Sequence, residues 1–248
     1  MFKISRLLYI ISLFIFCAAP PKKNIIKPYS YSIDEFKKQN WYNKIKVLEN
    51  IEGISKEGNE RDLLNSAIED KNIAIKKEAL RKIQKLKLKE YKSKALNLTS
   101  HKDPIIRWYS LYFLEGLDSE KEILPVFTQR FKDKEWLVRE SAFRGVRKFE
   151  NEKKTKEYFF SILFSLDEKN PLVLRQIYKT LYWYEDSRAL PYLLKRSYHA
   201  STNTELMFIL IELARYRNSD VKKRLRQVIE SHPDRVVRNF ALKLYIKK

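Results

Sequence analysis

The side chains that most often carry catalysis or hold metals are few and scattered in this sequence. Cys17 is the only cysteine, which excludes an intramolecular disulfide and a thiolate metal cluster. His101, His199 and His232 lie far apart, and none stands four residues from another or directly before a glutamate. We therefore expect no metal, no cofactor and no catalytic residues, and a chain that is not an enzyme.

Loops that bind phosphate need glycines close together, because the backbone must approach the ligand without side chains in the way. The sequence has four glycines: Gly53, Gly58, Gly116 and Gly145. Gly53 and Gly58 have the outer spacing of a nucleotide-binding loop, but Asn59 follows where that motif requires lysine. The sequence therefore excludes nucleotide-binding folds that depend on such loops.

The chain carries a formal net charge of +20 over 248 residues. A surface this basic attracts polyanions, among them nucleic acid, anionic lipid headgroups, acidic glycans and acidic proteins. A second interpretation is compositional, because the sequence is rich in lysine, isoleucine and asparagine together. Under that interpretation much of the lysine is simply exposed to solvent.

The first residues have the pattern of a bacterial export signal. Lys3 and Arg6 precede an apolar run over residues 7–16, and small residues follow Cys17. The run is shorter than the ~20 residues that a membrane-spanning helix needs. The segment resembles the lipobox of bacterial lipoproteins, although Phe16 stands where that motif has a small residue, and the resemblance implies acylation of Cys17.

We therefore expect residues 1–17 to be a signal peptide and the mature chain to be a membrane-anchored lipoprotein of the cell envelope. Secretion after ordinary cleavage and an uncleaved anchor remain alternatives. Residues 18–32 contain Pro20, Pro21 and Pro28 beside several lysines. Because proline blocks helix formation, we expect this segment to be an extended tether.

The remainder of the chain repeats itself. An aliphatic residue followed by a basic one recurs with spacings of 31, 32, 36, 32 and 31 residues, and Leu206-Met207 fills one position of the series. The other pairs are Ile75-Lys76, Ile106-Arg107, Val138-Arg139, Leu174-Arg175 and Val237-Arg238. A period in this range predicts stacked helical hairpins that bury their apolar faces on one another.

Apolar residues recur four and eight positions after each aliphatic residue. Residues at this spacing lie on one side of an α-helix, so the second helix of each hairpin is expected to have one buried face. These second helices are expected over about 75–85, 104–116, 135–148, 171–184, 203–216 and 234–246. The clearest first helices are expected over 120–131, 156–166, 188–198 and 221–229, with Pro125 kinking its helix or delaying its start. Residues 33–50 are expected to form a helix that caps the stack.

The turn and helix start at Asp103-Pro104-Ile105-Ile106-Arg107 resemble HEAT repeats, in the short bacterial form related to phycobilisome-lyase repeats. The resemblance covers about residues 60–248 and implies an all-α solenoid of about six hairpins, placed with its cap at 33–248. It also implies a ladder of turn acids and arginines between repeats, which Asp133 with Arg139, and Asp70 with Lys76, would join. The ladder residues are Asp70, Lys76, Asp103, Arg107, Asp133, Arg139, Arg175 and Arg238.

In such solenoids the second helices line the concave surface, so we expect their unburied positions to face a partner. These positions mix cations with aromatic rings, a combination that suits a polyanion or an acidic peptide. The candidate surface is Lys77, Arg81, Trp108, Tyr112, Arg144, Arg147, Trp183 and Arg215. The alternative is that the rings bury against neighbouring repeats. A second dense group of lysines lies between residues 76 and 94, and it is either a solvated helix and loop or a landing site for an acidic membrane surface or a polyanion.

These observations predict an exported scaffold without catalytic activity that binds a protein or peptide, possibly acidic, on its concave face. The membrane is a further expected partner through the N-terminal lipid. The alternative is a basic nucleic-acid-binding protein similar to HEAT-like DNA glycosylases, which export from the cytoplasm disfavours. A third class, iron-dependent hydroxylases related to these repeats, requires His-Glu pairs that the sequence lacks.

Overall fold

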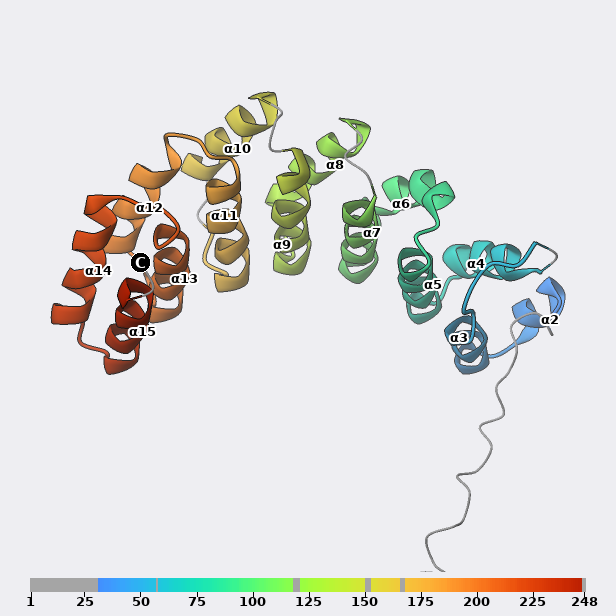
Figure 1. The fold of residues 1–248 in the computed structure, drawn as a ribbon. Helices are drawn as coiled ribbons and strands as arrows, with labels where there is room; N and C mark the ends of the chain where they lie inside the picture. The colour runs from blue at the N-terminus through green and yellow to red at the C-terminus, as the bar shows by residue number, and fades with distance from the viewer. Residues whose placement is uncertain (1–30, 57, 118–120, 150–152, 166–167, 247–248) are drawn as a thin grey trace, which may run out of the picture.

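The computed structural model describes residues 31–56, 58–117, 121–149, 153–165 and 168–246. In these ranges it contains α-helices and short 3-10 turns but no strand. The helices stack side by side into an open arc with two layers (Figure 1). The predicted all-α solenoid is therefore confirmed. The expected signal peptide over 1–17 and almost all of the expected tether over 18–32 lie outside the described residues.

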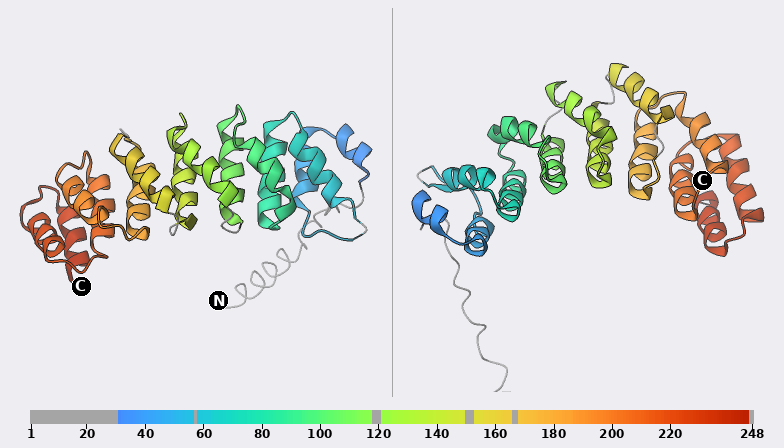
Figure 2. Two further views of the ribbon diagram at one scale, coloured as in Figure 1. Left: turned by 90° about the horizontal axis from the view of Figure 1, so that it is seen from above. Right: turned by 180° about the vertical axis from the view of Figure 1, so that it is seen from behind.

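One layer lines the inside of the arc, where each helix packs against the next along the chain (Figures 1 and 2). We refer to this layer as the inner helices. It comprises α3 (Trp41–Glu49), α5 (Ile73–Lys85), α7 (Pro104–Gly116), α9 (Trp136–Gly145), α11 (Pro171–Trp183), α13 (Asn203–Leu213) and α15 (Arg235–Ile246).

The other layer covers the outside of the arc. It comprises α2 (Ile33–Lys38), α4 (Glu60–Glu69), α6 (Lys92–Leu98), α8 (Leu124–Gln129), α10 (Lys153–Ser165), α12 (Ala189–Tyr198) and α14 (Ser219–Ser231). Among the described residues, three 3-10 turns adjoin these outer helices, namely η2 (Lys89–Tyr91), η3 (Lys121–Ile123) and η4 (Arg130–Lys132). A fourth, η5 (Val146–Phe149), directly follows the inner helix α9. No helix in the described part of the chain is both long and apolar enough to cross a membrane.

The N-terminal cap differs from the single helix expected over 33–50. It is a pair of helices, α2 and α3, because two side chains each start a helix. Ser32 accepts a hydrogen bond from the Glu35 backbone N–H at 3.2 Å, and Asn40 accepts one from the Asn43 N–H at 2.9 Å. The Asn40 cap satisfies donors that a continuous helix would have satisfied internally, so the chain turns there and begins again.

Proline and short polar side chains also start the inner helices. Pro104 begins α7 directly after Asp103, whose carboxylate accepts a hydrogen bond from the Ile105 N–H at 2.8 Å. Proline is tolerated in the first turn because its missing N–H would have no helical partner there. Pro125 acts in the expected way: a 3-10 turn precedes it, and α8 begins only at Leu124.

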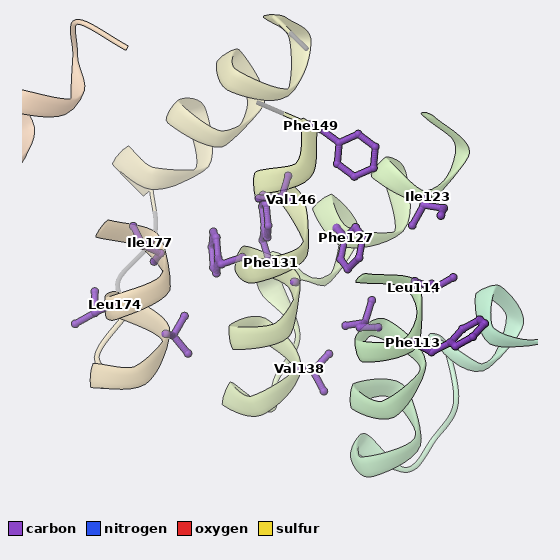
Figure 3. Close-up of a cluster of buried hydrophobic side chains, with 14 of the residues drawn as sticks. Phe113, Leu114, Ile123, Phe127, Phe131, Val138, Val146, Phe149, Leu174 and Ile177 are labelled. Carbon is purple, nitrogen blue, oxygen red and sulfur yellow. The ribbon is translucent and has the colours of Figure 1, made fainter. Parts of the chain in front are cut away.

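The core is a continuous apolar seam between the two layers, and aromatic rings dominate its middle (Figure 3). Phe131 stacks on Phe143 with ring centroids 4.1 Å apart, and Phe159 meets both rings edge to face. These rings come from η4, α9 and α10, so the seam joins one repeat to the next. Rings in such arrangements contribute ~0.5–1.5 kcal/mol per pair beyond the burial of their area.

Two glycines in equivalent places provide a test of this packing. Gly145 ends α9, and a Cβ there would lie 2.1 Å from Cε1 of Phe127, whose ring is fully buried. Gly116 ends α7, and the nearest atom to its Cβ would be Nε2 of Gln84 at 4.0 Å.

We predict that Gly145→Ala destabilises the protein by about 1–3 kcal/mol, because the ring must shift within a packed core. Gly116→Ala should stabilise it by about 0.5–1 kcal/mol, since alanine restricts the unfolded chain and meets nothing when folded. Urea unfolding of both variants measures the difference. Equal stabilisation by the two substitutions would contradict the close packing of Phe127.

Candidate binding surface on the inner helices

A hollow of about 550 Å³ opens across four consecutive inner helices, α7 to α13. Its walls come from the C-terminal halves of three helices, from η5 and from the residues that follow α13. The lining residues are Glu115, Arg144, Arg147, Lys148, Lys179, Trp183 and Arg215. Five cations therefore share one small space with a single acidic residue on its wall.

Arg144 is held rigidly between two carboxylates. Its Nε lies 2.7 Å from Glu115 Oε2 on α7, and its Nη1 lies 3.1 Å from Glu140 Oε2 on its own helix. The guanidinium also lies over the ring of Tyr112, 5.5 Å from the centroid. Contacts on three sides fix the orientation of Arg144, so its charge is largely balanced within the protein.

Arg215 has a comparable partner in Glu212, which is 2% exposed. Arg215 Nε lies 3.1 Å from Glu212 Oε2, and its guanidinium lies over the ring of Tyr182 at 4.8 Å. That oxygen accepts no hydrogen bond from the described residues, so the contact is an ion pair without good hydrogen-bond geometry. Burial raises the pKa of the Glu212 carboxyl, and the charges of Arg215 and Lys179 oppose this shift.

Arg147 and Lys179 differ from these arginines because neither forms an ion pair with any described residue. Arg147 donates a hydrogen bond from Nε to the Arg144 carbonyl at 3.2 Å. Burial lowers the pKa of Arg147, and burial together with the charges of Arg175 and Arg147 lowers the pKa of Lys179. The carboxylates of Glu115 and Glu212 act on Arg147 only from beyond ion-pair distance, and that of Glu212 acts in the same way on Lys179. Two partly desolvated cations that share one hollow without a direct ion pair favour an incoming anion.

Trp183 forms an apolar wall beside these cations. Its side chain is 50% exposed, so the indole ring is available to a ligand. Lys148 borders the same space and donates a hydrogen bond to the Leu117 carbonyl at 2.6 Å. An exposed ring beside fixed cations can contact the apolar part of a ligand while the cations hold its charge.

The eight residues predicted for the concave surface divide into two groups. Arg144, Arg147, Trp183 and Arg215 share the hollow. Lys77, Arg81, Trp108 and Tyr112 lie on α5 and α7, outside its lining.

The second group is ordered by its own contacts. Arg81 Nη2 lies 2.5 Å from Glu78 Oε1, which balances its charge. The rings of Trp108 and Tyr112 stack with centroids 5.9 Å apart. Tyr112 then reaches the hollow through the cation–π contact with Arg144. The rings of Trp108 and Tyr112 therefore lie beside the hollow. The alternative that Trp108, Tyr112 and Trp183 all bury against neighbouring repeats is wrong for Tyr112 and Trp183, which are exposed.

Two basic lining residues, Lys148 and Lys179, are absent from the sequence-based set. Lys148 lies in η5, where 3-10 geometry has three residues per turn and shifts the phase that an α-helix would continue. Lys179 stands five positions after Leu174, next to the buried face, and its long stem reaches the hollow. Lys179 is the one basic residue at this fifth position, where the other repeats have apolar residues, and this difference was the available signal. Those residues are Leu80, Leu111, Phe143, Ile211 and Leu242.

Two of the expected ladder arginines pair with acidic residues of the next repeat. Arg107 pairs with Asp133 of the next repeat, with Nε–Oδ2 at 2.9 Å and Nη2–Oδ1 at 2.7 Å. Arg139 pairs with Glu168 at 2.6 Å and contacts only the backbone carbonyls of its own turn, including that of Asp133. Asp133 and Arg139 therefore each connect two repeats, but they do not pair with each other, because each guanidinium extends forward to the following turn.

The first ladder pair is also redistributed. Asp70 accepts a hydrogen bond from Lys44 of α3 at 2.8 Å, whereas Lys76 donates to the Ile68 carbonyl at 2.6 Å. Asp103 caps α7 instead of pairing with a cation. The charge of lysine lies on a single ammonium group at the end of a flexible chain, so Lys76 donates to a backbone carbonyl. An arginine at this position would form a two-point contact with a carboxylate.

The last ladder residues lack acidic partners in the described part of the chain. Arg238 Nη1 donates to the carbonyl of His232 at 2.7 Å. Arg175 lies over the Phe208 ring at 5.4 Å. The turn over residues 200–203 contains no acidic side chain, and this explains why Arg175 turns to an aromatic ring.

The lysine-rich group between residues 76 and 94 is partly structural. Lys82 is buried and donates to the carbonyls of Glu49 at 2.7 Å and Ile51 at 3.0 Å, at the end of α3. Lys94 donates to the Asn65 side chain at 2.9 Å. Cations at the C-terminus of a helix stabilise its unpaired carbonyls. Several members of this group therefore hold repeats together, which weakens the case for a second polyanion site.

Comparisons with known proteins assign no family. No family model matches the sequence. No curated protein matches it either. The structure is similar to that of human deoxyhypusine hydroxylase in complex with glycerol, with 14% sequence identity, 87% of this chain and 96% of that chain covered, and a TM-score of 0.41.

That neighbour is an enzyme, and this finding counts against the sequence-based expectation that the chain is not one. The expectation that the chain is not an enzyme is therefore corrected. The identity and TM-score are too low for the likeness to assign an activity, a substrate or a cofactor to this chain.

The Arg107–Asp133 pair provides a test of the forces between repeats. Both side chains are nearly buried, with 6% and 5% exposed. Burial alone would raise the pKa of Asp133, but hydrogen bonds from Arg107 and the Glu135 N–H lower it below its ordinary value of 3.8. A depressed carboxyl pKa adds stability above the unfolded-state pKa, and this stability is lost as the pH falls through the folded-state pKa.

We predict that Arg107→Met destabilises the protein by about 3–5 kcal/mol near neutral pH, because it leaves a buried carboxylate without its partner. The Arg107→Met/Asp133→Asn double variant should be more stable than the sum of the single variants implies, with a coupling of about 1–3 kcal/mol. The gap between wild type and Asp133→Asn should narrow below about pH 4. Urea unfolding across pH measures both effects, and a zero coupling would contradict the pairing.

Proposed function

We propose that this chain is an exported scaffold that binds an acidic protein or peptide along its inner helices. One observation carries the proposal: five cations line the hollow beside one acidic residue, and Arg147 and Lys179 form no ion pair with the described residues. An acidic side chain entering the hollow would supply the missing counter-charge. The exposed indole of Trp183 would contact the apolar part of the same ligand.

The arrangement of acids supports a peptide over a polynucleotide. Glu115 and Glu140 hold Arg144, and Glu212 holds Arg215, so carboxylates interrupt the cations along the surface. A regular phosphate backbone would pass close to these carboxylates and be repelled. Nucleic acid is the second candidate, because an exposed tryptophan beside cations also suits a stacked base.

The direct test compares acidic-peptide binding by two double variants with equal charge. Arg147→Gln/Lys179→Gln removes the cations without ion-pair partners, whereas Lys222→Gln/Lys223→Gln removes two exposed cations from α14. We expect binding of a labelled poly-glutamate peptide to weaken about 10- to 100-fold in the first variant and by less than about twofold in the second. Fluorescence anisotropy at fixed salt measures both.

Urea unfolding of the same proteins checks that the substitutions leave the fold intact. If the two double variants lose affinity equally, binding follows net charge alone and the inner-surface proposal fails. If single-stranded DNA competes fully with the peptide and binds more tightly, the nucleic-acid alternative is favoured.

We further propose that the chain is a lipoprotein of the bacterial cell envelope, acylated at Cys17. The basic start, the short apolar run and the position of the only cysteine support this, and a lipid at that point would place the tether over 18–32 between membrane and solenoid. We predict that the wild-type protein is recovered with membranes and released by detergent, whereas Cys17→Ser is recovered in the soluble fraction. Identical fractionation of both proteins would contradict acylation, and recovery of wild type in the medium would favour secretion.

A further inference from the structure

We propose that the hollow contains a subsite for a group with two negative charges, either a phosphate monoester or two adjacent carboxylates on the bound peptide. This inference rests on the proposed function and narrows its ligand. It comes from the difference between cations that the protein neutralises itself and cations that it leaves without partners.

The ion pairs account for the charges in the hollow in a simple way. Glu115 and Glu140 are both committed to Arg144, and Glu212 is committed to Arg215. Arg147 and Lys179 remain on the wall without an ion pair to any residue that the structure describes. Glu115 and Glu140 together exceed the single charge of Arg144, and Lys148 on the wall offsets that excess. Five cations therefore oppose three carboxylates, and two positive charges remain, so a dianion would balance them whereas a singly charged group would leave one.

The position of these two cations favours a compact dianion. Arg147 is held at the end of α9 by its hydrogen bond to the Arg144 carbonyl, and Lys179 extends from the neighbouring helix α11. Both cations line the same hollow. Burial lowers the pKa of Lys179, and the positive charges of Arg175 and Arg147 lower it further. A dianion that contacts both Arg147 and Lys179 offsets these charges, whereas phosphodiesters carry only one charge per group.

The charge of Glu212 provides a second, independent test of dianion binding at the same site. Its carboxylate is buried behind the hollow and interacts with Arg215, Lys179 and Arg147. It is therefore a built-in competitor for the charge of a ligand. Removing its charge should strengthen dianion binding, an effect that a damaged fold would not produce.

Four capped peptide probes test the inference on the full chain by isothermal titration calorimetry. Each carries glycines around a central phosphoserine, a Glu-Glu pair, a single glutamate or a single glutamine. We expect the better of the two dianionic probes to bind at least about tenfold more tightly than the single-glutamate probe. The ranking of the phosphoserine and Glu-Glu probes identifies which source of the double charge the site prefers.

Variants locate the binding in the hollow. Arg147→Gln and Lys179→Gln should each reduce dianion affinity by about tenfold, to the level of the single-glutamate probe. Glu212→Gln should raise dianion affinity by at least about threefold. The matched control, Lys222→Gln on the outer helix α14, should leave it unchanged.

Equal binding of the dianionic and singly charged probes would overturn the subsite, as would loss of affinity in Lys222→Gln equal to that in Lys179→Gln. A thymidine dinucleotide that binds as tightly as the better dianionic probe would also overturn it. These failures are distinguishable from failure of the proposed function. In that case the long poly-glutamate peptide itself would bind without dependence on the inner cations.

Discussion

Each hairpin of this protein has an apolar face that only its neighbour can cover, and the rest of the structure depends on this constraint. The buried rings of Phe131 and Phe143 meet across the junction of outer and inner layers, and Phe159 of the next repeat closes the same cluster. Stacking therefore continues in one direction and sets the inner helices side by side. Because successive inner helices align equivalent positions, the polar residues at those positions lie on one continuous surface.

Charged side chains have two structural roles in this stack of hairpins. Buried pairs such as Arg107 with Asp133 connect consecutive turns and restrict the rotation of one repeat on the next. On the inner surface, arginines such as Arg144 are instead oriented by carboxylates from neighbouring helices. A cation that has a partner contributes to the shape of the surface, whereas a cation without an ion pair is available to the ligand that we propose. The formal charge of +20 does not make this distinction, because many of its lysines serve as helix caps and links between repeats.

The helical repeat could be predicted from the sequence because the periodicity of a helix depends only on residues close together in the chain. The spacing of the aliphatic–basic pairs predicted the inner helices, and α7 over Pro104–Gly116 begins and ends where it was expected. Positions facing away from the core could be chosen from the same pattern, which identified Arg144, Arg147, Trp183 and Arg215. The pattern missed Lys148 because a 3-10 turn changes the number of residues per turn at the end of α9.

The sequence by itself determined the all-helical repeat, the buried face of each helix and the residues available to the inner surface, because these follow from periods within one helix. Only the tertiary structure decided which cations have partners. Asp133 pairs with Arg107 and not with Arg139, since the distance across the junction between repeats selects the forward neighbour. The same distances leave Arg147 and Lys179 without ion pairs in the hollow. Partner choice depends on contacts between segments about 30 residues apart, and no local pattern records them.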